Sequence, residues 1–183
     1  MTDYNGAAVA VNGVENSVAG LGFITLPMKD GGNRNIGHVK VNLTFSGVAG
    51  VAGGDQNAKE YGLRSLWSGT SGSNIFSGGM PTVTATKAEL QDGDAAAEKT
   101  ALFGGLSKAD ILTQLQAVDP SVNTLTSHSE SGTENMKYTN GNVASASYAL
   151  GIADGQTIEA TFDTAVTAST QWSAPLNVAI TYN

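Results

Sequence analysis

Apolar and polar residues alternate along several segments of the chain, with the period of two that a half-buried β-strand requires. In HVKVNLTF, residues 38–45, the odd positions are apolar and the even positions are polar, so one face would be buried and the other solvated. The last segment alternates in the same way from Leu176 to Tyr182. The alternation predicts six strands, at residues 7–11, 20–27, 36–46, 143–150, 156–162 and 174–182.

Asn-Gly and Asp-Gly pairs divide these segments. Asn or Asp followed by Gly suits the positive φ angles of tight hairpin turns, so each pair is expected to mark a strand end. The pairs occur at residues 12–13, 30–31, 92–93, 140–141 and 154–155. A chain of 183 residues is long enough for one sandwich or barrel with a sizeable core, so we expect a single β domain over residues 1–183.

Residues 47–118 break the strand pattern. They begin with a Gly-rich, irregular stretch and end with two helical segments. Asp94 is expected to cap the first helix, AAAEKTALF, which would stop at Gly104-Gly105. Ser107, with Asp110 three residues later, forms a capping-box-like start for the second, which would end before Pro120. The stretch is therefore predicted to be an insertion into the β framework.

The composition is typical of an extracellular β protein: 14% of residues are charged, 40% are hydrophobic and 23 are glycine. The net charge of −7, with no run of Lys and Arg, argues against nucleic acid and anionic membranes as partners. The chain has no cysteine, which excludes disulfides and thiolate sites. It shows no signal-peptide pattern, so a secreted form would have a leader that was cleaved or that lies outside this sequence.

Few residues indicate catalysis or metal binding. The two histidines, His38 and His128, are expected to face solvent, and the chain contains no HExxH, GxSxG or GxxxxGK motif. The run at residues 92–94 has two aspartates, but a turn and helix cap explain it better than calcium binding. We expect no catalytic residue, no metal and no cofactor. A secreted glycoside hydrolase is the weaker alternative, because no spacing favours any pair among Glu60, Glu89, Glu98 and Glu159.

Two aromatic residues stand in a polar, Gly- and Ser-rich setting. RSLW at 64–67 and NIF at 74–76 place Trp67 and Phe76 among short polar residues. An aromatic face flanked by polar groups can stack on the apolar face of galactose, while a large exposed ring is otherwise costly. Alternatively, both rings pack under the insertion as a small core of their own.

The C-terminal segment YALGIADGQTIEATFDTAVTASTQWSAPLNVAITYN, residues 148–183, resembles the end of the FaeG and ClpG family. These proteins are the major subunits of thin enterobacterial fimbriae, assembled by the chaperone/usher pathway, and in the FaeG type the subunit is also the adhesin. The resemblance continues through ENMKYTNGNVASASYAL, LFGGLSKADILTQLQ, LPMKDGG and HVKVN. It therefore extends, with gaps, from about Thr2 to the end.

The resemblance implies an all-β, mainly antiparallel, incomplete immunoglobulin-like sandwich with an inserted subdomain carrying two short helices. The missing strand would leave a hydrophobic groove, filled first by a periplasmic pilus chaperone and then by the neighbouring fimbrial subunit after passage through an outer-membrane usher. The fimbria would stand on the bacterial cell surface after periplasmic transit. The groove is expected to be lined by Leu176, Val178, Ile180 and Tyr182.

The resemblance also implies a receptor. The family's inserted subdomain, a hairpin and two helices, recognises galactose-containing host glycans, and residues 47–118 occupy its place. The residues that match the family's receptor motifs are Ser65, Leu66, Trp67, Ile75 and Phe76, with Trp replacing a Phe. The loop SGTSGSN between the motifs differs from the family, which leaves a purely structural subunit without receptor binding as the alternative.

The front of the family's sequence has no counterpart here. Family members begin with a donor extension and several strands, and no free alternating arm precedes Asn12-Gly13. We therefore expect a chain that can accept a donor strand but cannot donate one.

Overall fold

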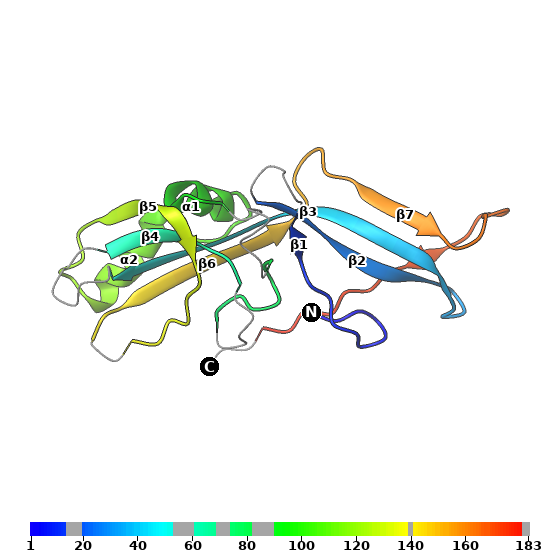
Figure 1. Cartoon of the computed structure of the whole chain (residues 1–183), viewed down its shortest axis with the longest axis horizontal. Coiled ribbons are helices and arrows are strands. Elements are labelled where there is room, and N and C mark those ends of the chain that lie inside the picture. The colour runs from blue at the N-terminus through cyan, green and yellow to red at the C-terminus, as the bar shows by residue number, and fades with distance from the viewer. Residues whose placement is uncertain (14–19, 53–60, 69–73, 82–89, 139–140, 181–183) are drawn as a thin grey trace.

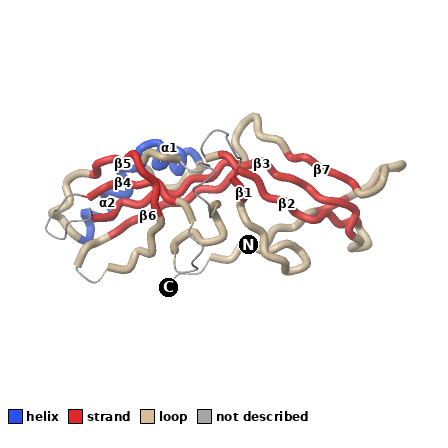
Figure 2. The backbone as a smooth tube through the Cα atoms, in the orientation of Figure 1, coloured by secondary structure: helices blue, strands red, loops and turns tan. Residues whose placement is uncertain are grey.

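The computed structural model describes residues 1–13, 20–52, 61–68, 74–81, 90–138 and 141–180, and its strands join in one mixed, mainly antiparallel sheet. The molecule is elongated, with both helices at one end (Figures 1 and 2). The strands are β1 Asn12–Gly13, β2 Leu21–Asp30, β3 Asn35–Ala52, β4 Tyr61–Leu66, β5 Leu125–Gly132, β6 Ala144–Gly151, β7 Ile158–Phe162 and β8 Trp172–Ser173. The helices are α1 Gly93–Leu102 and α2 Lys108–Val118.

β3 is the strand around which the sheet is built. Its first half pairs with β2 on one edge and β7 on the other, and its second half pairs with β4 and β6. All four pairings are antiparallel, whereas β4 pairs with β5 in parallel. β6 and β7 lie one after the other along the same edge of β3, and the loop at residues 152–157 joins them.

The two faces of β3 have different covers. The odd positions from Val39 to Val51 share one face. Residues of the N-terminal segment, Met80 and Met136 pack on this face and cover it. The even positions are covered only in the second half, where α1 and α2 pack on Val48. In the first half the even positions His38, Lys40 and Asn42 lie on the other face, where His38 is exposed. The period of two predicted the two faces of residues 38–45 correctly, but not the helical cover of the second half of β3.

Helix α1 begins earlier than predicted. Its N-cap is Asp92, whose side chain accepts a hydrogen bond from the Ala95 backbone N–H at 2.8 Å, and not Asp94. Asp94 instead forms an ion pair with Lys108 at 2.7 Å. The helix starts where it touches the sheet: a Cβ on Gly93 would lie 2.1 Å from the Leu63 carbonyl oxygen, so only glycine allows this contact.

Helix α2 agrees with the sequence. Ser107 and Asp110 form a capping box, and the helix ends at Val118, before Pro120. Neither α1 nor α2, the helices in the described part of the chain, is long and apolar enough to cross a membrane.

Four of the six predicted strands are confirmed with shifted ends, namely β2, β3, β6 and β7. The strand predicted at residues 7–11 is wrong: this segment is irregular, and a bridge joins Thr2 and Ala8. Asn12-Gly13, predicted as a turn, pairs with β2 as β1. His128, expected to face solvent, is half-buried with its ring over Gly62 of β4.

The strand predicted at residues 174–182 is also wrong over its described part. Residues 172–173 pair with β2 as β8, and Asn177 then forms an isolated bridge with Thr2. The remaining residues to Ile180 form no regular ladder, and residues 181–183 lie outside the described part. An alternating sequence needs a neighbouring edge to become a strand, and here a single bridge from the N-terminal segment provides that edge.

The fold class is confirmed as mainly antiparallel β with two helices, as expected for an immunoglobulin-like sandwich that carries helices. The proposed boundary of an insertion at residue 47 falls inside β3, which continues without a break to Ala52. The receptor-binding subdomain at residues 47–118 remains a prediction.

The contact at Gly93 predicts that Gly93→Ala destabilises the chain, although alanine favours helices more than glycine. The new methyl group would force α1 away from β4, at a cost of about 1–3 kcal/mol. Gly31→Ala is the matched control, because a Cβ there meets nothing within 4 Å. Chemical denaturation of both variants measures the effect, and equal free energies of unfolding would contradict the packing argument.

Candidate functional site

The structure brings together the two sequence motifs, residues 65–67 and 75–76. Leu66, Ile75 and Phe76 pack in one cluster on the face of the sheet opposite the helices. The segment 132–134 connects the motifs, because its carbonyl oxygens accept backbone hydrogen bonds from residues 67 and 75, each at 2.9 Å. Phe76 precedes Tyr148 by 72 residues in the sequence, yet its ring stacks on Tyr148 of β6.

The side chains of these five residues differ in exposure. Ser65 and Leu66 are buried, with 1% and 2% of their surface exposed. Trp67, Ile75 and Phe76 are half-buried. A bound ligand could therefore touch Trp67, Ile75 and Phe76, whereas Ser65 and Leu66 can only support them.

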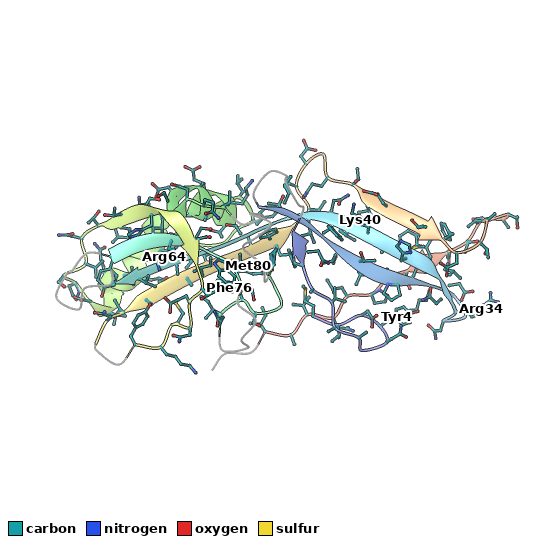
Figure 3. The ribbon with its side chains drawn as sticks, in the orientation of Figure 1. Tyr4, Arg34, Lys40, Arg64, Phe76 and Met80 are labelled. Atoms are coloured by element: carbon teal, nitrogen blue, oxygen red, sulfur yellow. The ribbon has the colours of Figure 1, made fainter. Side chains whose placement is uncertain are left out.

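Phe76 is held in place by Tyr148. The two rings stack with their centroids 5.1 Å apart and their planes at 27° (Figure 3 labels Phe76). Phe76 has a φ of +59°, a left-handed conformation that bulky residues rarely adopt, and the stacked ring holds it there. One face of Phe76 is thus already occupied by a protein ring.

Tyr148 also fixes the loop that carries Phe76. Its phenol O–H donates a hydrogen bond to the Gly79 carbonyl oxygen. Burial raises the pKa of this phenol above its ordinary value of 10.0, so the donor stays protonated well into alkaline solution. Met80, fully buried beside Gly47 of β3, holds the other end of the loop.

A second candidate surface lies on β7. Ile158 and Ala160 share the apolar face with Val41 and Val39 of β3, which they oppose directly. The residues that cover this face over β2 do not cover β7, where Ile158 is 55% exposed. The apolar face therefore continues beyond its cover, and β7 pairs with β3 alone among the described strands.

The predicted groove residues at the C-terminus lie in different surroundings. Leu176 is half-buried and packs against the core under β2. Val178 and Ile180 are 61% and 72% exposed, and Tyr182 lies outside the described residues. The groove lining remains a prediction, with Leu176 already in contact with this chain's own core.

The glutamates weighed for glycoside hydrolysis do not form a pair in the described part. Glu60 and Glu89 lie outside it, while Glu98 and Glu159 belong to α1 and β7. A hydrogen bond from Asn42 lowers the pKa of the Glu159 carboxyl, the reverse of what a general acid needs. Among the described residues no group of three or more acidic or histidine side chains is placed to hold a metal ion.

Three residues of this region were not among the predicted site residues. Arg64 precedes the first motif, and Tyr138 and Tyr148 reach the same face from distant segments. Arg64 is the only charged residue in GLRSLW, residues 62–67, and this was a visible signal in the sequence. The tyrosines gave no local signal, because their contacts depend on strand register across the sheet.

A model of the fimbrial major and minor subunits matches residues 1–183. The chain belongs to this family. It is similar to the K88 fimbrial proteins AD, AC and AB of Escherichia coli, with 50% identity over 182, 183 and 188 residues and 99% of this chain covered in each case. The resemblance seen in the sequence is thereby confirmed.

The chain spans 62% of the length of these three relatives. What the whole protein binds and assembles with is therefore a proposal.

Tyr148 predicts a specific pH dependence of stability. Above the ordinary tyrosine pKa of 10.0 the unfolded chain loses a proton that native Tyr148 keeps, so stability falls as the pH rises. In Tyr148→Phe this contribution is absent, and the fall across pH 10 should be shallower. The variant should also lose about 1 kcal/mol at neutral pH, because the bond to Gly79 is gone. Urea denaturation at several pH values tests this, and identical slopes for both proteins would contradict it.

Proposed function

We propose that the chain is a structural subunit of a fimbria on the bacterial cell surface, reached after periplasmic transit, and that it works without catalysis or a cofactor. Its partners would be a periplasmic pilus chaperone, an outer-membrane usher and neighbouring subunits. Membership of the fimbrial subunit family supports the proposal. The observation that carries it is the uncovered apolar face of β7 and β3.

The assembly step is donor-strand complementation. An extended segment with alternating apolar residues could lie over Ile158, Ala160 and Val41 and fill the exposed face. Main-chain hydrogen bonds would give such a complex affinity, and the alternate side chains would give it register. An exposed apolar strand edge is an aggregation hazard in an isolated chain, which explains why a chaperone would be needed.

The apolar side chains near the C-terminus are a second exposed group, which follows β8 on the side of β2 and not of β7. Val178 and Ile180 are exposed, and Leu176 before them already packs on the core. Burial of one such side chain contributes about 1.5–3 kcal/mol, so two or three in contact with a donor would outweigh the cost of ordering it. We therefore retain the groove residues inferred from the sequence and propose the face of Ile158 as a separate acceptor surface.

We further propose that the subunit binds galactose-containing host glycans. The support is the half-buried Trp67 at the end of β4, at the position of the family's receptor motif. An indole is amphipathic, with a broad apolar face and an N–H that bonds to hydroxyl groups. Ile75 and Phe76 of the neighbouring loop pack with Leu66, the residue before Trp67.

A purely structural subunit is the second candidate. It is favoured by the burial of Ser65 and Leu66 and by the stacking of Phe76 on Tyr148, both of which give the motif residues a packing role. In that case residues 47–118 would be a surface decoration of the fimbria.

The assembly proposal predicts that Ile158→Asp abolishes donor-strand binding. A carboxylate there would have to be buried without a partner when the donor strand binds. Thr161→Asp is the matched control, because Thr161 is exposed and lies on the other face of the same strand. Binding of a donor-strand peptide and co-purification with a pilus chaperone are the measurements. Unchanged binding by Ile158→Asp, or none by the wild type, would disprove the proposed surface.

The adhesion proposal predicts that Trp67→Ala removes glycan binding. Loss of one aromatic stacking partner at a sugar site should weaken affinity by at least about tenfold, which corresponds to 1.4 kcal/mol. Trp172→Ala on β8 is the control, because Trp172 is 40% exposed and belongs to a strand that pairs with β2. A glycan array with both variants and the wild type is the test. Equal binding by all three, or no binding at all, would leave the purely structural role.

A further inference from the structure

Residues 1–9 form a small hairpin, the N-terminal hairpin, which is closed by its own hydrogen bonds. The Asp3 backbone N–H donates to the Ala7 carbonyl oxygen at 2.9 Å. The buried Asp3 carboxylate accepts the backbone N–H groups of Asn5 and Ala7 at 2.8 and 2.9 Å. Gly6 has a φ of +81°, a conformation that glycine adopts without strain. The hairpin is therefore a local unit that can move without breaking its own bonds.

The N-terminal hairpin pairs with the C-terminal segment. Thr2 and Asn177 exchange two backbone hydrogen bonds, at 2.9 and 2.8 Å, in an antiparallel bridge. The Asn177 side-chain amide also donates to the Asp3 carbonyl oxygen at 3.2 Å. In Figure 1 the C-terminal segment accordingly passes beside the N-terminus. These three bonds occupy the edge of the C-terminal segment at residue 177.

The hairpin also fills part of the apolar surface that the C-terminal segment borders. Met1 and Val9 pack in the same core as Leu176. In the antiparallel order of the bridge, Met1 is the next residue toward Val178. Beyond the hairpin, Val178 and Ile180 are 61% and 72% exposed. The hairpin thus covers the beginning of the C-terminal groove residues and leaves their end open.

Few contacts hold the hairpin on the rest of the molecule. Besides the bonds to Asn177, the Lys29 ammonium of β2 lies 5.0 Å from the centroid of the Tyr4 ring, which Figure 3 labels. Such a cation–π contact is weak where solvent reaches it. Residues 5–8 are exposed. A unit with few buried contacts and an exposed backbone opens at a small cost, which an incoming strand with similar bonds can offset.

A cover of this kind resolves a conflict at the C-terminal segment. A bare strand edge beside exposed apolar side chains promotes aggregation, and native proteins protect such edges by covering them. A donor strand, however, needs the same edge free for its main-chain hydrogen bonds. A cover that is held weakly protects the edge in the isolated chain and leaves it during assembly.

We propose that the N-terminal hairpin is a displaceable cover of the C-terminal groove residues, and that the donor strand of a neighbouring subunit takes its place on Asn177. The inference rests on the proposed donor-strand complementation and adds a control step to it. Thr2 makes the backbone contact that must break, and Met1 leaves the apolar surface together with it.

A reversible covalent lock tests the displacement. Directly opposed residues that exchange both backbone bonds have Cα atoms about 5.5 Å apart, a separation that a disulfide can span. The chain has no cysteine, so Thr2→Cys combined with Asn177→Cys gives a single defined pair. The probe is a short fluorescent peptide in which valine and threonine alternate, with a lysine at each end. The oxidised chain should bind it at least about tenfold more weakly than the reduced chain, because the locked hairpin keeps the edge.

Thr2→Ser combined with Asn177→Ser is the matched control for the lock. It changes the same two positions and cannot form a disulfide, so the same oxidant should leave its affinity for the peptide unchanged.

A single substitution tests the opposite direction. Thr2→Pro removes the N–H that Asn177 accepts, whereas Thr2→Val changes the side chain and keeps that N–H. Thr2→Pro should bind the peptide about tenfold more tightly than Thr2→Val, because the backbone bonds no longer favour the covered state. Equal affinities would contradict the inference.

The outcomes separate the cover from donor-strand binding itself. If oxidation does not change the affinity, or if no disulfide forms, the hairpin is not the cover and donor-strand binding stands. Binding that ignores the lock and disappears in Ile158→Asp would place the donor strand on β7 and overturn this inference alone. No binding by the wild type, Thr2→Pro or the reduced cysteine pair would overturn both proposals. If Thr2→Pro does not fold, the cysteine pair decides, since its two redox states are compared in one protein.

Discussion

The structure depends on the backbone ladders of β3. This strand of 18 residues is about 60 Å long at 3.3 Å per residue and has partners on both edges over most of its length. Every other main strand except β5 is fixed in register by pairing with it directly. Because side chains alternate along one strand, the register of β3 also decides which residues of β2, β4, β6 and β7 face each core.

The helices meet this sheet through small and polar groups as well as apolar ones. The Ser46 hydroxyl on β3 donates to the Ala96 carbonyl oxygen at 2.9 Å, and Ser147 on β6 accepts the Leu106 backbone N–H at 2.8 Å. Ser145 bonds to Gln114 of α2 at 2.6 Å. These serines are buried, so the helical cover is held by satisfied hydrogen bonds on a face that a hydrophobicity pattern would assign to solvent.

This explains which parts of the fold the sequence could predict. The alternation at residues 38–45 located β3 and its buried face, and the Ser107 capping box located α2, because both signals are local. The start of α1 was missed because it depends on the contact of Gly93 with β4, which lies 30 residues earlier. The strand at residues 174–182 was mispredicted for a similar reason: its alternation is real, but one bridge to Thr2 is the ladder contact it finds within the described chain.

The same distinction applies to the candidate sites. A surface for an incoming strand needs an alternating sequence next to an open edge. The alternation of β7 can be read from its sequence, whereas its open edge can be seen only in the structure. A binding site needs side chains from several strands in one register, and the place of Arg64 beside Gly132 likewise follows from the parallel pairing of β4 with β5. That pairing includes a register shift between Leu63 and Ser65, at the position of Arg64. Such an irregularity redirects a side chain without leaving a mark in the sequence, so the surroundings of Arg64 become visible only once the strands are paired.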